Sequence, residues 1–223
     1  MKTYIIANWK ANKSVSAAKQ WCTDFLAARP TSEHTVVICP GFQLLQTVAA
    51  ELQSSTYALG AQTVSPFAQG AYTGAVAATQ LSELHVQYVL VGHSERRKYF
   101  HETSEVVAQQ VSQALQAGST PVVCIDVPYL HEQLSLIPES ELQQCLVAYE
   151  PLASIGTGVH EDVGSVQSVV SQVHAFSAEV PVLYGGSVNS ENVQEYCLVT
   201  RGVLVGGASL DAAAFADLVA AVA

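Results

Sequence analysis

Eight short runs rich in β-branched and other apolar residues recur along this 223-residue chain, and they constrain its fold more than any other feature. Longer segments with helical periodicity separate them, such as Ser16–Ala28 and Ser104–Ala117. Nearly continuous apolar strands that alternate with helices are typical of a parallel sheet buried on both faces. The predicted strands are Tyr4–Trp9, Val36–Pro40, Tyr57–Gln62, Tyr88–His93, Pro121–Asp126, Leu146–Glu150, Pro181–Gly185 and Gly202–Gly206.

Eight such units predict an α/β fold in which residues 1–223 form a closed (β/α)8 barrel as a single domain. A doubly wound open sheet is the structural alternative, but no GxGxxG fingerprint follows the first strand. The chain is shorter than the ~250 residues typical of such barrels, so some outer helices must be trimmed. Pro128 and Pro138 lie in the segment between Cys124 and Glu150, which predicts shortened helices around helices five and six.

The charge of the chain excludes several classes of partner. Nine Lys and Arg against nineteen Asp and Glu give a net charge of −10. Nucleic acids and anionic membranes require a basic surface, so we expect neither as a partner. Charged residues make up 13% of the chain, about half the usual share of a soluble domain. Such a surface fits an oligomer that hides part of itself, and it fits a neutral polar surface equally well.

Targeting, redox and metal signals are absent from the sequence. The start of the chain enters a strand without a secretory apolar core, and no apolar run approaches the ~18 residues of a membrane-spanning helix. The five cysteines include no CxxC pair, which favours reduced, buried thiols in a cytoplasmic protein. No HxH or HExxH spacing predicts a metal site, and we expect neither a metal nor a cofactor.

Polar, titratable and glycine residues follow several of the predicted strands, where barrels of this kind build their sites. Glu150 precedes Pro151, which pushes it into extended geometry at a strand tip. By itself this stretch fits a solvated Glu on a surface turn as well as a catalytic base beside a glycine-rich loop. Asn8 and Lys10 are two residues apart, so the alternation of a strand would point both toward the barrel interior.

A histidine and two glycine pairs extend this set. His93 is followed by Ser94-Glu95, a plausible helix start whose dipole disfavours the imidazolium form. Ser187 follows one Gly-Gly pair, and Gly206-Gly207 lie at the end of the last predicted strand. Glycine backbone near a helix start is suited to holding an anion without a basic cluster.

The chain resembles the triosephosphate isomerase family over essentially its whole length. The matching strings occur in the family's order and on the expected strand ends. They are A-N-W-K-A-N, G-A-Q, G-A-Y-T-G, G-H-S-E-R-R, A-Y-E-P with I-G-T-G, Y-G-G-S-V and L-V-G-G-A-S-L. The resemblance implies a TIM barrel that interconverts dihydroxyacetone phosphate and D-glyceraldehyde 3-phosphate through an enediolate, in glycolysis and gluconeogenesis. It also implies a cytoplasmic homodimer, and a higher oligomer remains an alternative.

The resemblance assigns roles to residues of this chain. Glu150 would be the base, and His93 would be the electrophile that polarises the carbonyl. Asn8 and Lys10 would contact the substrate, and Glu95 would support Lys10. The residues expected to bind the phosphate are Gly156, Ser187, Gly206 and Gly207, together with Asn8 and Lys10.

The departures from the family pattern cluster around the stretch from Val147 to Gly158 that contains Glu150. Ala153 stands where the family usually has an aromatic residue, and Asp126-Val127 replace the usual Gly-Glu after the fifth strand. Val159-His160-Glu161 replace a small, polar hinge. These changes predict intact chemistry with an altered equilibrium between the open and closed forms of the loop. Ala75 replaces an acidic residue after T-G, which removes an expected intersubunit salt contact.

Two other functions compete with the isomerase. One is a different phosphate-binding barrel enzyme, a lyase or synthase, which would usually show a Schiff-base lysine or further acids at strand ends. The other is a non-catalytic scaffold, which predicts the loss of Asn8, Lys10, His93 or Glu150. All four residues are present in this chain.

Overall fold

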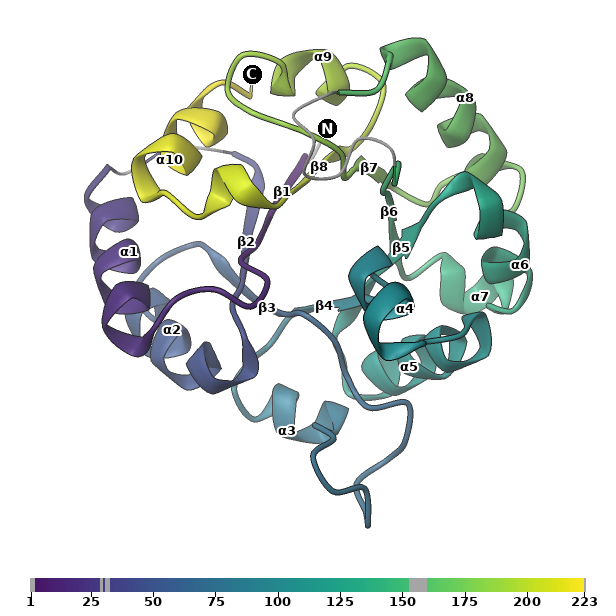
Figure 1. Ribbon diagram of the computed structural model, residues 1–223, viewed down its shortest axis with the longest axis horizontal. Helices are drawn as coiled ribbons and strands as arrows, with labels where there is room; N and C mark the ends of the chain where they lie inside the picture. The colour runs from purple at the N-terminus through teal and green to yellow at the C-terminus, as the bar shows by residue number, and fades with distance from the viewer. Residues whose placement is uncertain (1–2, 29, 31–32, 153–159, 223) are drawn as a thin grey trace.

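The eight parallel strands of the protein close into a barrel in the order β1 to β8, with the helices arranged around it (Figure 1). The structure is a computed structural model that describes residues 3–28, 30, 33–152 and 160–222. The closed α/β barrel is therefore confirmed, and each predicted strand corresponds to an observed one. The strands are β1 (Tyr4–Asn8), β2 (Thr35–Cys39), β3 (Ala58–Ala61), β4 (Tyr88–Val91), β5 (Thr120–Ile125), β6 (Leu146–Tyr149), β7 (Val182–Tyr184) and β8 (Gly202–Val205).

The ring closes where β8 pairs with β1. Tyr4 lies opposite Gly202, and the register continues to Ala7 opposite Val205. Gly202 has a φ of 137°, and a Cβ at this position would overlap the carbonyl oxygen of Tyr4. Only glycine therefore suits this point of closure.

Strand side chains alternate between two apolar clusters, as the period of a β-strand requires. One cluster fills the barrel interior, and the other packs between the barrel and its helices. In β1, for example, Ile6 belongs to the inner cluster, whereas Ile5 and Ala7 belong to the outer one. The inner cluster consists of Ile6, Val37, Cys39, Ala58, Leu90, Val122, Cys124, Leu146, Ala148, Leu183 and Leu204.

The helices vary widely in length. The longest are α1 (Val15–Ala28), α5 (Ser104–Gln116) and α8 (Val163–His174). The others are α2 (Leu45–Leu52), α3 (Ala78–Ser82), α4 (Ser94–Phe100), α6 (Leu130–Ser135), α7 (Glu139–Leu142), α9 (Val193–Cys197) and α10 (Ala212–Ala220), with the 3-10 turns η1 (Phe42–Leu44), η2 (Val127–Tyr129) and η3 (Gly207–Ser209).

The expected shortening is correct after β5 and wrong after β6. The β5–β6 connection contains only α6 and α7, of 6 and 4 residues. The helix after β6 is α8, which spans 12 residues. It is not trimmed, because Asp162 caps its start and its buried valines recur at helical spacing. The other short helices are α3 and α9, which follow β3 and β7.

An aromatic cluster joins the first strand to the helices on either side of it. Trp9 lies edge-on to Trp21 of α1 at 4.8 Å, and Trp21 stacks on Phe25 at the same distance. Phe215 of α10 contacts both Trp21 and Phe25. The Trp21 indole also donates a hydrogen bond to the carbonyl of Ser209. This packing fixes the turn after β8 against the beginning of the chain.

The five cysteines are free, and Cys22, Cys39, Cys124 and Cys145 are buried. Burial raises the pKa of the half-buried Cys197 thiol to about 11, so it too is protonated near neutral pH. The prediction of buried, reduced thiols is therefore confirmed, with Cys197 only partly covered. Within the described ranges, none of the helices is long and apolar enough to cross a membrane.

The interior of the barrel leaves no space at Gly60. A Cβ there would overlap the Cys39 sulfur and approach Val37 Cγ1 to 2.9 Å. We expect Gly60→Ala to destabilise the fold by about 1–3 kcal/mol in chemical denaturation. Adding Cys39→Ala should recover part of this loss, so that the two effects are not additive. Gly207→Ala is the control, because a Cβ at Gly207 meets no atom within 4 Å. Equal destabilisation by both glycine variants would contradict the packing argument.

Candidate active site

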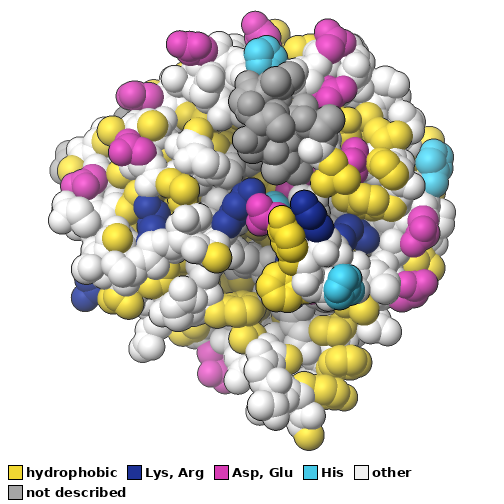
Figure 2. All heavy atoms as spheres, viewed as in Figure 1, with side chains coloured by type: hydrophobic (Ala, Val, Ile, Leu, Met, Phe, Trp, Pro, Cys, Tyr) yellow, Lys and Arg dark blue, Asp and Glu magenta, His cyan; other side chains and the backbone are white. Residues whose placement is uncertain are grey.

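A cavity of about 320 Å³ opens at the carboxyl ends of the strands. On this face, acidic and basic side chains gather at the centre, over the strand ends (Figure 2). Residues that face the barrel interior continue beyond the inner cluster to this cavity. Asn8, Glu150 and Gly206 each lie two residues after an inner-cluster residue, so they face the same way. The cavity is lined by Asn8, Lys10, His93, Glu150, His160, Gly185, Gly186, Ser187, Val188, Asn189, Asn192, Leu204, Gly206, Gly207 and Ala208.

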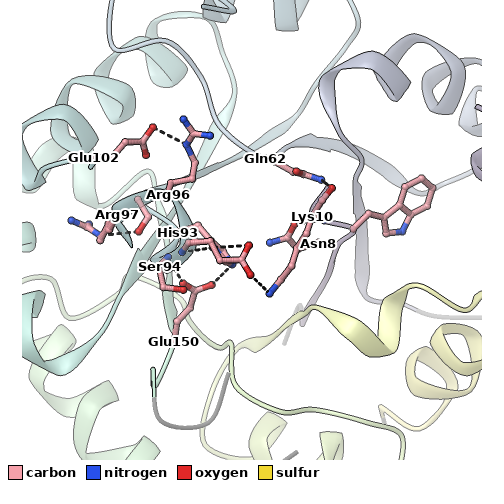
Figure 3. A network of polar contacts seen from close by, with 12 residues as sticks. Asn8, Lys10, Gln62, His93, Ser94, Arg96, Arg97, Glu102 and Glu150 are labelled. Atoms are coloured by element: carbon pink, nitrogen blue, oxygen red, sulfur yellow. Dashed lines mark hydrogen bonds and ion pairs between the residues drawn. The ribbon is translucent and has the colours of Figure 1, made fainter. Parts of the chain in front are cut away.

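Glu150 lies at the base of this cavity with its carboxylate held by two donors. Its side chain is only 2% exposed, and its Oε1 is 2.9 Å from His93 Nε2. Its Oε2 accepts a hydrogen bond from the Ser94 N–H at 3.0 Å. Figure 3 shows the carboxylate directed at both residues, which come from the start of α4. Glu150 is therefore a buried carboxylate beside a histidine, and the alternative of a solvated surface Glu is wrong.

The hydrogen bonds of His93 assign its tautomer. His93 is the residue that caps α4, and its Nδ1 accepts a hydrogen bond from the Glu95 N–H at 3.1 Å. A nitrogen that accepts an N–H carries no proton, so the ring proton lies on Nε2 and points at Glu150. The helix start predicted from Ser94-Glu95 is thus confirmed, and it holds the neutral ring in this geometry.

The pKa values of the pair reflect opposing effects. Burial lowers the pKa of His93, but the adjacent Glu150 carboxylate outweighs it and raises that pKa above its usual value. For Glu150, burial raises the pKa, whereas His93, the Ser94 N–H and the Lys10 charge hold it below its usual range. The helix start alone predicted the opposite direction for His93, because it took no account of the carboxylate at Nε2.

Lys10 reaches the cavity in a different way from the one that strand alternation predicts. Strand β1 ends at Asn8, and Lys10 has a left-handed φ of 53°. Its N–H is bound by Asn8 Oδ1 at 3.0 Å, and its carbonyl by the Gln62 amide at 2.8 Å. These bonds hold a strained backbone that strand geometry would not produce. Strand alternation therefore predicted the correct location of Lys10 for the wrong reason.

The Lys10 ammonium is paired with Glu95. The distance from Lys10 Nζ to Glu95 Oε1 is 2.7 Å, and the Glu95 side chain is 40% exposed. Glu95 does not itself line the cavity, but it contacts two residues that do, Lys10 and His93. Lys10 also lies near Gly206, since a Cβ at Gly206 would be 3.7 Å from the Lys10 Nζ.

Glycine backbone forms part of the cavity wall. Gly206, Gly207 and Ser187 line it, as the sequence predicts. Gly207 begins the short turn η3, and space remains open beside its Cα. Gly185 lies close to Glu150, because a Cβ there would be 3.0 Å from Glu150 Cγ. Glycine at these positions leaves room both for the carboxylate and for a ligand.

Some predicted residues cannot be placed, and others were missed. Gly156, Ala153 and Val159 lie outside the described residues. Asn189, Asn192 and His160 line the cavity, although the sequence singled out none of them as site residues. The sequence indicates a role for His160 only as part of an altered hinge. The two asparagines follow Ser187 closely in the chain, and that proximity was the signal available for them.

The altered residues after β5 have a local role. Asp126 caps η2 by accepting the Val127 N–H at 2.7 Å, and its other oxygen accepts the Leu152 N–H at 3.4 Å. Val127 is about half exposed. Asp126 thus links the end of β5 to the residues just after Glu150. In residues 3–28, 30, 33–152 and 160–222, no group of three or more His, Cys, Asp or Glu side chains is arranged to hold a metal ion.

The contact between Glu150 and His93 predicts a shift in the titration of His93. Glu150→Gln removes the charge that stabilises the imidazolium, so the pKa of His93 should fall. The measurement is an NMR titration of labelled histidine. Glu95→Gln is the matched control and should lower this pKa less, because Glu95 is more exposed and 3.8 Å away. A His93 pKa that stays the same or rises in Glu150→Gln would contradict the assigned contact.

Comparison with known proteins agrees with this geometry. The family model described as triosephosphate isomerase matches residues 3–222. A triosephosphate isomerase of Symbiobacterium thermophilum is 38% identical over 252 residues, covering 100% of this chain and 98% of that protein. Those of Synechococcus sp. (strain JA-3-3Ab) and Thermus thermophilus are 36% and 34% identical, and each alignment covers at least 95% of both chains. The chain belongs to the triosephosphate isomerase family.

Proposed function

We propose that this chain interconverts dihydroxyacetone phosphate and D-glyceraldehyde 3-phosphate by proton transfer through an enediolate. The observation that carries the proposal is the 2.9 Å contact between the buried Glu150 carboxylate and His93 Nε2, inside a cavity with a glycine-lined side. The family membership supports the same reaction. A base, a neutral hydrogen-bond donor and an anion site are the three functions that this chemistry requires.

Glu150 is the proposed base. Its lowered pKa keeps it ionised near neutral pH, and its burial removes the water that would otherwise solvate it. To act as the base, one oxygen of the Glu150 carboxylate must give up its present hydrogen bond and contact the substrate. The proton it takes from the carbon beside the carbonyl is then returned to the former carbonyl carbon. The hydroxyl proton on the first carbon passes to the former carbonyl oxygen, which completes the conversion of the ketose into the aldose.

His93 and Lys10 are proposed to stabilise the developing enediolate oxygens. The Nε2 proton of His93 now points at Glu150 and is available to the substrate once the carboxylate moves. Lys10 supplies a positive charge that the chain, at −10, lacks overall. Glu95 positions this ammonium, and Asn8 both lines the cavity and fixes the Lys10 backbone.

The phosphate is proposed to bind at Ser187, Gly206 and Gly207. Backbone N–H groups at the start of a turn attract an anion without requiring basic side chains. Gly156 is the further predicted ligand, and it lies outside the described residues. Lys10 reaches the edge of this region, so its charge acts on both ends of the substrate.

The rival functions receive less support. A Schiff-base lyase needs a neutral amine, and Lys10, the lysine among the described lining residues, is paired with Glu95 at 2.7 Å. A scaffold would have no reason to bury the Glu150 carboxylate against two donors, since burying a charge is costly.

We also propose that residues 1–223 act as one domain in a cytoplasmic homodimer. The segment between β3 and α3 projects from the barrel (Figure 1). It carries Phe67 and Tyr72, which stack at 4.3 Å and remain about half exposed. Exposed aromatic residues on a projection fit a pocket on a second subunit. A higher oligomer is the alternative, and sedimentation analysis distinguishes the two.

Activity of the wild-type chain is tested with D-glyceraldehyde 3-phosphate in an assay coupled to reduction of dihydroxyacetone phosphate. Glu150→Gln should lower kcat by about 10² to 10⁴-fold, the usual contribution of a general base, while inorganic phosphate still binds. The exposed Glu132→Gln on α6 is the matched control and should be unaffected. A folded wild-type chain without activity would refute the proposed function. Near-normal turnover in Glu150→Gln would remove Glu150 from the role.

Gly207→Ala tests the phosphate site. The added methyl would occupy the open space beside Gly207, which the phosphate needs. We expect KM to rise by about 10- to 200-fold, the range for one misplaced methyl group, at nearly unchanged stability. An unchanged KM would show that the phosphate binds elsewhere.

A further inference from the structure

Three residues from separate elements meet behind one wall of the cavity: Glu161 before α8, Tyr184 at the end of β7 and Tyr196 on α9. The Glu161 N–H donates to the Tyr184 hydroxyl at 3.0 Å. The Tyr196 hydroxyl donates to the Glu161 carbonyl at 2.6 Å. The two rings stack with their centroids 3.9 Å apart, and both side chains are fully buried. Both backbone polar groups of Glu161 are thus held by phenols.

The two phenols are connected to the cavity through Tyr184. Gly185 and Gly186, which line the cavity, follow it directly. A Cβ at Gly186 would overlap the Tyr184 hydroxyl, so this phenol lies directly against the glycine backbone. On the other side, Glu161 follows His160, another lining residue. The position of Glu161 therefore affects two parts of the cavity wall.

Helix α9 forms hydrogen bonds with both of these parts of the cavity wall. Asn192, at its start, donates from its side-chain amide to the Ser187 carbonyl at 3.2 Å. Tyr196 lies four residues later, on the same side of the helix, and holds the Glu161 carbonyl. Residues one helical turn apart therefore hydrogen-bond to the loop that contains Ser187 and to Glu161, which follows His160.

The hydroxyl of Tyr196 needs an explanation beyond packing. A phenylalanine would stack on Tyr184 equally well without burying a polar group. A buried hydroxyl costs stability unless it is hydrogen-bonded, and the partner of this one is a backbone carbonyl beside the cavity. The short distance indicates a well-formed bond.

We propose that Tyr196 is a positioning residue for the phosphate end of the cavity. By holding the Glu161 carbonyl and stacking on Tyr184, it sets the separation between His160 and the wall formed by Gly185, Gly186 and Ser187. The inference rests on the proposed function, which places the substrate phosphate against this wall. Tyr196 itself is absent from the cavity lining, so it acts through its neighbours.

The test is Tyr196→Phe, which removes the hydroxyl and keeps the ring. Two readouts are compared: the affinity for inorganic phosphate by calorimetry, and the kinetics with D-glyceraldehyde 3-phosphate. We expect phosphate to bind about 3- to 10-fold more weakly, as for one lost neutral hydrogen bond. KM should rise by a similar factor with kcat within about 2-fold, because the phosphate is held equally in the ground and transition states.

Tyr57→Phe is the matched control. Its hydroxyl also donates to a backbone carbonyl, that of Pro30, at 3.1 Å, and Tyr57 is absent from the cavity lining. It should lose a comparable amount of thermal stability and leave phosphate affinity and KM unchanged. Tyr184→Phe removes the other bond to Glu161 and should weaken phosphate binding as well. The double variant should lose less than the sum, because both hydroxyls act on one residue.

The outcomes separate this inference from the proposed function. If Tyr196→Phe resembles Tyr57→Phe, with lower stability and wild-type phosphate affinity, Tyr196 is only a packing residue and the inference is overturned. A wild-type chain that does not bind phosphate also overturns it. A wild-type chain that binds phosphate but does not isomerise triose phosphates refutes the proposed function, and weaker phosphate binding by Tyr196→Phe would still support the positioning role.

Discussion

Closure of the barrel between β1 and β8 is the constraint on which the rest of the structure depends. Gly202 permits it, because any side chain there would collide with the Tyr4 backbone. Closure brings the end of β1 next to the end of β8, so Lys10 lies beside Gly206 although nearly the whole chain separates them. In an open sheet the first and last strands would lie at separate edges. The cavity exists only because the ring is complete.

The site stabilises negative charge with hydrogen-bond donors, although the chain as a whole is acidic. Burying the Glu150 carboxylate is costly, and two donors from the start of α4 offset that cost. The same helix start supplies the Glu95 N–H that assigns the tautomer of His93. One short helix therefore orients the Glu150 carboxylate and His93 together. The proposed phosphate site is lined by glycine backbone, which would require few basic residues in a chain of net charge −10.

Short elements hold the site in place. Helix α9 has only five residues, yet Asn192 and Tyr196 attach it to two parts of the cavity wall. Turn η3 is held by the Trp21 indole at Ser209 and by the Lys13 ammonium at Leu210. These polar contacts attach short helices and turns to described residues next to the cavity.

The sequence by itself determined the barrel, the order of its strands and the titratable residues Lys10, His93 and Glu150 that line the cavity. These follow from local patterns, since alternation, helix starts and glycine pairs are written in neighbouring residues. Only the tertiary structure decided what those residues contact. The partners of Glu150 lie 56 and 57 positions away in the chain. The left-handed backbone of Lys10 is held by Gln62, and Tyr196 contacts Glu161, which is 35 positions away. Such contacts depend on how closed strands align and on side chains of distant segments, which no local pattern encodes.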